Sequence, residues 1–169
     1  MAGPDAARRY DLRPGRCYVV EEAPPSVSFD AFASLVSAPG GGAAGMAVTR
    51  QHPDLVRQRY GLERTPVYWL ATRAGEGVIS PTNLGILTQT LVKFIGDNDD
   101  GVILLDGLEY LVSNNDFGKV LKVVDQVHDH ISQSGSRLIL PVDPRAFEPR
   151  ELALLERNMD RIAGATDEG

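Results

Sequence analysis

Two acidic residues follow a short apolar run near the middle of the chain. Residues 102–106, "VILLD", end in Asp106, and Glu109 lies three positions further on. An apolar strand that ends in aspartate is typical of the Walker B strand of NTPases, where the aspartate holds Mg²⁺ and a nearby acid can orient water. Many parallel strands also end in this way, so Asp106 could instead cap the turn or pair locally.

The glycine-rich segment 39–50, "PGGGAAGMAVTR", has part of the spacing of a phosphate-binding loop. Gly40 and Gly45 match the two glycines of G-x-x-x-x-G-K-[ST], but Met46 and Ala47 stand where lysine and serine or threonine are required. A phosphate loop also follows a strand and opens a helix. This segment lies after a predicted helix and before a predicted strand, so we predict a plain helix-to-strand turn.

The first strand-to-helix turn is where a phosphate loop would be expected, and its composition is unsuitable. Residues 21–28, "EEAPPSVS", contain no glycine, and the two prolines lack amide hydrogens that could bind an anion. Glu21 and Glu22 would repel phosphate. The sequence therefore predicts a poor triphosphate site and no NTPase activity.

Other polar residues give weaker indications of a site. An arginine cluster could bind a phosphate-bearing ligand or an acidic partner, or could simply pair with the protein's own carboxylates; it comprises Arg50, Arg57, Arg59, Arg64 and Arg73. His128 and His130 are two positions apart in a predicted helix and cannot bind one metal ion from one face. Cys17 is expected to be a small buried residue. The chain contains no nucleophile motif, so we predict neither a metal site nor catalytic residues.

The elements that must position these residues alternate along the chain. Short apolar strands alternate with amphipathic helices, which is typical of a mostly parallel sheet covered on both faces, a three-layer α/β/α sandwich. We predict strands at 17–21, 45–50, 66–72, 76–80, 102–105 and 137–143, and helices at 28–37, 52–62, 80–98, 116–135 and 148–162. Ser28 and Ser80 are the expected N-caps of two helices, and Gly61 is the expected end of a third.

The size and charge of the chain limit its function classes. Its 169 residues suit one domain, predicted at 14–163, with a loose arm at 1–13 and a frayed tail at 164–169. A net charge of -6 argues against a nucleic-acid binder. No apolar run approaches the roughly 20 residues that span a bilayer, and the first residues lack a secretory signal, so we expect a cytoplasmic protein that does not bind membranes.

Several segments together resemble a known family. They are "VTRQHPDLVRQRYGL", "VYWLAT", "ISPTNLGIL", "GVILLDGLEYLVSNNDFGKVLK" and "LILPVDPRAF" with "ELALLER", and they span roughly residues 16–159. They resemble the mainly archaeal family catalogued as domain of unknown function 835. Its members are similar in pattern to RecA/KaiC-type ATPase domains without a phosphate loop, and related domains occur with histidine kinases and transcription regulators. The resemblance implies a degenerate RecA-like fold in prokaryotic signalling and no established activity.

These observations favour a non-catalytic module for sensing or for protein–protein interaction, with a histidine kinase or regulator as partner. One alternative is a nucleotide or small-ligand binder that uses Asp106 with Mg²⁺ and Arg50 for phosphate, and another is a self-associating scaffold. Open α/β folds bind ligands at the carboxyl edge of the sheet. We expect these residues to gather there: Arg50, His52, Asp106, Glu109, Asn114, Asn115 and Asp143.

Overall fold

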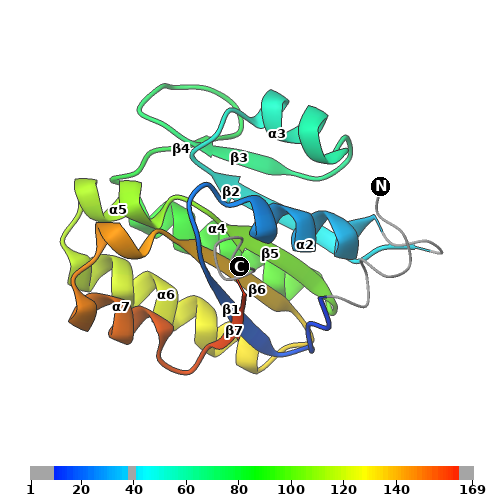
Figure 1. The fold of residues 1–169 in the computed structure, drawn as a ribbon. Coiled ribbons are helices and arrows are strands. Elements are labelled where there is room, and N and C mark those ends of the chain that lie inside the picture. Colours follow the sequence, from blue (N-terminus) through cyan, green and yellow to red (C-terminus); the bar gives the residue numbers. More distant parts are fainter. Residues whose placement is uncertain (1–9, 38–40, 164–169) are drawn as a thin grey trace.

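One parallel sheet forms the centre of the molecule. The structure, a computed structural model, describes residues 10–37 and 41–163 (Figure 1). Within these residues, seven strands pair in parallel in the order β4-β3-β2-β5-β6-β1-β7. The strands are β1 (Arg16–Glu21), β2 (Ala44–Thr49), β3 (Val67–Leu70), β4 (Val78–Ile79), β5 (Gly101–Leu105), β6 (Arg137–Val142) and β7 (Asp160–Ile162).

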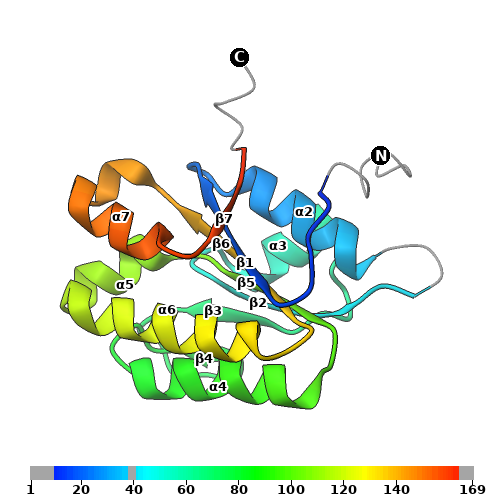
Figure 2. The same cartoon turned by 90° about the horizontal axis from the view of Figure 1, so that it is seen from below.

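Helices cover both faces of this sheet (Figure 2). Helices α2 and α3 pack on one face, and α4, α5, α6 and α7 pack on the other. Their bounds are α2 (Ser26–Val36), α3 (Pro53–Tyr60), α4 (Leu84–Asp97), α5 (Leu108–Asn114), α6 (Phe117–Ser132) and α7 (Pro149–Glu156), and a 3-10 turn, η1 (Pro144–Ala146), precedes α7. The predicted three-layer α/β/α architecture is confirmed.

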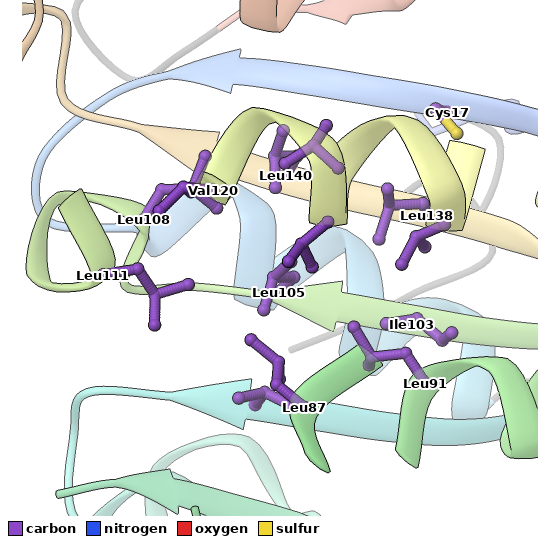
Figure 3. Close-up of a cluster of buried hydrophobic side chains, with 14 of the residues drawn as sticks. Cys17, Leu87, Leu91, Ile103, Leu105, Leu108, Leu111, Val120, Leu138 and Leu140 are labelled. Atoms are coloured by element: carbon purple, nitrogen blue, oxygen red, sulfur yellow. The ribbon is translucent and has the colours of Figure 1, made fainter. Parts of the chain in front are cut away.

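The alternation of side chains along β5 explains why both faces must be covered. Val102 and Leu104 pack beneath α2 and α3, whereas Ile103 and Leu105 pack against the helices of the opposite face, and all four are fully buried. Figure 3 shows Ile103 and Leu105 among leucines of α4 and β6. Burial of each such side chain is worth about 1.5–3 kcal/mol, so the central strand is stable only between two helical layers.

Cys17 lies in the core, as the sequence predicts. It is a free, buried cysteine of β1 that packs among apolar side chains (Figure 3). Burial, followed by the negative charge of Asp160, raises the pKa of its thiol to about 12. The thiol therefore stays protonated at neutral pH and is a poor nucleophile.

The structure describes part of the predicted N-terminal arm and none of the predicted tail. Tyr10 and Leu12 fall inside the predicted loose arm but are buried, and the hydroxyl of Tyr10 donates to Asp30 at 2.7 Å. Residues 1–9, Gly40 and the predicted tail at 164–169 lie outside the described residues. Among the described residues, no helix combines the length and the apolar character needed to cross a bilayer.

The predicted closing helix at 148–162 is wrong in its second half. Helix α7 ends at Glu156, because Arg157 is extended and Asn158 has a left-handed backbone, φ 67°. The chain then forms β7 beside β1, and Ile162 packs with the core beneath α2. The spacing of Met159 and Ile162 fits a helix, but pairing at the open edge of β1 determines the structure.

Two predicted helix starts are also wrong. Helix α2 begins at Ser26, so Ser28 is its third residue and not its N-cap. Helix α4 begins at Leu84, and Asn83 rather than Ser80 caps it by accepting from the Ile86 amide at 3.1 Å. The predicted end of α3 is confirmed, because Gly61 has φ 67°, a left-handed conformation that glycine adopts without steric cost.

Two carboxyl groups meet where α7 approaches the end of β1. Glu156 is hydrogen-bonded to Glu21, and Arg161 of β7 forms an ion pair with Glu21 and lies 3.8 Å from Glu156. The Oε2 atom of Glu156 is buried without a hydrogen-bond partner. Burial, followed by the contact with Glu21, raises the pKa of Glu156 to about 7, although Arg161 opposes this rise.

This pair predicts a pH dependence of stability. Between the ordinary pKa of 4.5 and about 7, the folded chain retains a proton that the unfolded chain releases, so this group makes folding less favourable as pH rises. Gln at position 156 carries no such proton. We expect Glu156→Gln and the wild type to melt alike below the ordinary pKa of 4.5, and the variant to melt higher above pH 7, in thermal denaturation. A constant difference in melting temperature across this range would contradict the prediction.

Candidate functional site

A pocket lies at the carboxyl edge of the sheet, where three strand-to-helix turns meet. The strands are parallel, so the turns after β1, β2 and β5 lie at the same edge of the sheet. Between them lies a cavity of about 350 Å³. This volume is at the lower end of the range for small-molecule sites.

Glu22 occupies the N-terminus of α2, in the turn after β1. Glu22 is 5% exposed, and its carboxylate accepts from the amide of Val27 at 3.0 Å and from the amide of Ser28 at 2.8 Å. The Ser28 hydroxyl also donates to it, at 2.7 Å. The N-cap position, Pro25, supplies no side-chain cap, so Glu22 satisfies the free amides of the first helical turn.

This contact removes the place where a phosphate would bind. A helix N-terminus attracts anions because its amides point outward and its dipole is positive at this end. Here the chain's own carboxylate fills that position, and a second anion beside it would be repelled. The prolines that follow, Pro24 and Pro25, line the pocket.

Asp106 lies at the buried end of the pocket, directly after β5. It is 7% exposed, and its Oδ2 accepts from the Thr49 hydroxyl at 2.7 Å. Burial raises the pKa of Asp106, while hydrogen bonds from Thr49 and from the Arg50 and Gly107 amides oppose that rise. Gly107 has φ 103°, which favours glycine, and a Cβ there would lie 3.0 Å from the side chain of Leu70.

Glu109, in the first turn of α5, also lines the pocket and forms an acidic wall together with Asp106. Its Oε1 accepts from the Asp143 amide at 2.9 Å, and burial raises the pKa of its carboxyl. Asp143 itself does not line the pocket, and its carboxylate pairs with Arg145 at 2.9 Å. This hydrogen-bonded pair lowers the pKa of Asp143.

Two exposed arginines lie at the opening of the pocket. The guanidinium of Arg50 lies 4.1 Å from the ring centre of Tyr110 and donates to the carbonyl of Leu70 at 2.9 Å. Arg59 and Tyr60, at the end of α3, line the side that faces the β1–α2 turn. The Tyr60 ring stacks on Phe29 of α2 at 4.9 Å between ring centres.

The remaining predicted site residues lie elsewhere. His52 caps α3 by accepting from the Asp54 amide at 3.2 Å, and its ring lies 5.0 Å from that of Trp69 in a separate hollow. Asn114 and Asn115 lie at the end of α5, where their side-chain amides donate to backbone carbonyls of Tyr110 and Leu111. The structure therefore brings Asp106, Glu109 and Arg50 together, places Asp143 beside Glu109, and separates the other three.

Sequence reasoning missed several residues of the pocket. Tyr60, Tyr110 and Gln51 line it, but none belongs to a motif. Tyr110 and Glu109 reach the pocket from the first turn of α5, a short helix that no pattern in the sequence predicts. The sequence singles out Glu22 as a repulsive charge, whereas its role as an internal cap depends on the turn geometry.

The Glu22 contact predicts a large effect on stability. Glu22→Ala leaves the amides of Val27 and Ser28 without their buried acceptor, so we expect a loss of about 2–3 kcal/mol in the free energy of unfolding, measured by urea denaturation.

Glu63→Ala is the matched control because Glu63 is an exposed glutamate on the loop after α3. We expect the control to lie within about 0.5 kcal/mol of the wild type. A Glu22→Ala variant as stable as the control would mean that the cap contributes little.

Comparison with known proteins gives a family and a related fold. The family described as "Protein of unknown function (DUF835)" matches residues 27–159. No curated protein matches the chain. Among solved structures, a protein from Pyrococcus horikoshii OT3, determined in a structural study, is similar with a TM-score of 0.62 and 12% sequence identity, over 90% of this chain and 83% of that chain.

The structural similarity supports the α/β fold alone, since sequences this different can share a fold without sharing a function. The family match begins within α2 and covers the turns after β2 and β5 and most of the described elements, whereas the turn after β1 lies outside it. The chain belongs to the family of proteins of unknown function called DUF835.

Proposed function

We propose that this chain is a non-catalytic sensing module, derived from a RecA-like nucleotide-binding fold, that binds a small ligand in the pocket at the carboxyl edge of its sheet. The observation that carries the proposal is the Glu22 carboxylate at the N-terminus of α2. A P-loop enzyme holds and neutralises the phosphates of its substrate at a helix N-terminus of this kind. Glu22 supplies a negative charge there instead.

The acidic residues of the pocket support the idea that this fold derives from an NTPase and has lost the catalytic activity. Asp106 ends the central apolar strand, as a Walker B aspartate does, and it faces the same edge as Glu22. Burial raises the pKa of Asp106, and the negative charge of Glu22 adds to this rise. Asp106 accepts hydrogen bonds from Thr49 and from two backbone amides, which is a structural role.

The pocket favours ligand binding over the use of the fold as a plain scaffold. Its buried end contains two carboxyl groups and its opening contains two arginines, a combination suited to orienting a small molecule. The prokaryotic and mainly archaeal signalling role, the histidine kinase or regulator partner and self-association stay predictions from the resemblance. In this proposal, occupancy of the pocket would be read by such a partner at the turns that surround it.

Nucleotide hydrolysis tests the proposal. We expect purified protein with ATP or GTP and Mg²⁺ to release phosphate no faster than a no-protein control, because nothing in the pocket neutralises a triphosphate at α2. Asp106→Asn, which keeps the size of the side chain, should give the same rate. Phosphate release that depends on Mg²⁺ and is abolished in Asp106→Asn would show that the protein is an enzyme and would overturn the proposal.

A further inference from the structure

We propose that the pocket binds a nucleoside monophosphate whose base carries an amino group, with the base at the acidic end and the phosphate at the arginines. This inference rests on the binding function proposed above for the same pocket. The orientation is opposite to that of a phosphate loop, in which the phosphates lie at the helix N-terminus.

The position of Glu22 fixes the direction in which an anion can approach. Its carboxylate already accepts both amides at the start of α2, so no phosphate can use them. The cations of the pocket are Arg50 and Arg59, and both are exposed. An anionic group therefore binds at the opening, where it remains partly solvated and close to two positive charges.

The buried end of the pocket has unused capacity to accept hydrogen bonds. A carboxylate offers about four acceptor positions. Asp106 uses three, for the Thr49 hydroxyl and the amides of Arg50 and Gly107. Glu109 accepts from the Asp143 amide and from its own amide. A ligand that donates hydrogen bonds through an amino group fits this wall, whereas a carbonyl at the same position would face carboxylate oxygens.

The walls between these two ends suit a flat ring. Pro24 and Pro25 line one side of the pocket, and the rings of Tyr60 and Tyr110 contribute further apolar surface. Aromatic side chains commonly contact nucleobases through stacking. The cavity of about 350 Å³ is at the lower end of the range for ligand sites, which favours a mononucleotide over a dinucleotide.

Two pairs of ligands test the orientation without any mutation. AMP and IMP differ by an amino group in place of a carbonyl on the base, and so do CMP and UMP. A hydrogen bond to a charged group corresponds to about tenfold or more in affinity. By isothermal titration calorimetry, we expect AMP to bind at least about tenfold more tightly than IMP, and CMP more tightly than UMP.

Variants at the two ends of the pocket test which end binds the base and which end binds the phosphate. Glu109→Gln keeps an oxygen for the Asp143 amide but removes the charge, so the preference for AMP over IMP should be lost. Arg59→Gln should weaken all four monophosphates alike, by about two- to fivefold, as expected for an exposed ion pair, and leave adenosine unchanged. The controls Glu63→Gln and Arg64→Gln replace exposed residues outside the pocket and should change no affinity.

Three results would overturn the inference: no binding of any monophosphate at millimolar concentration, equal binding of AMP and IMP, or AMP affinity unchanged in both pocket variants. Circular dichroism of each variant shows whether the fold is intact, and the AMP and IMP comparison on the wild type does not depend on any variant. These failures would leave the non-catalytic function standing. That function fails separately, if ATP hydrolysis occurs and requires Asp106.

Discussion

The hydrogen bonds between the Glu22 carboxylate and the first turn of α2 connect the fold to the site. Helix α2 carries the chain from β1 across two strands to β2, and its Phe29 and Phe32 are fully buried against the sheet. A helix in this position needs its free amides satisfied at the end that meets the sheet edge. Glu22 provides the acceptor from within the turn, so the helix is stable without any bound anion.

The Glu22 contact also affects the charge distribution at the carboxyl edge of the sheet. Burial raises the pKa of both Asp106 and Glu109, and the negative charge of Glu22 adds to the rise at Asp106. The arginines of the pocket are both exposed: Arg50 follows β2, and Arg59 lies at the end of α3 beside the turn after β1. The edge therefore combines a cavity lined by carboxyl groups and arginines with a helix N-terminus that Glu22 already occupies.

The sequence predicts the architecture well because its strands are short, apolar and separated by amphipathic helices. The segment 102–105 is a clear case, since four consecutive apolar residues suit a strand covered on both faces. Strand β7 could not be predicted in the same way. Its residues fit a helical stripe, and only the open edge of β1 beside them favours a strand.

The site is predictable only in part, because it depends on which turns the topology brings together. Asp106, Glu109 and Arg50 follow strands whose ends meet, and the sequence predicts all three. Asn114 and Asn115 lie close to Asp106 in sequence, but α5 carries them away from the edge, and no pattern in the sequence predicts that short helix. Tyr60 reaches the pocket because α3 ends there, which requires knowledge of the helix length.

The amide resonances of Val27 and Ser28 provide the most direct test of the role assigned to Glu22. In a nuclear magnetic resonance titration with inorganic phosphate and then with ATP and Mg²⁺, these two amides should keep their chemical shifts, because an internal carboxylate already holds them. Saturable shifts of both amides would mean that a phosphate displaces Glu22, and the α2 N-terminus would then be a functional phosphate site.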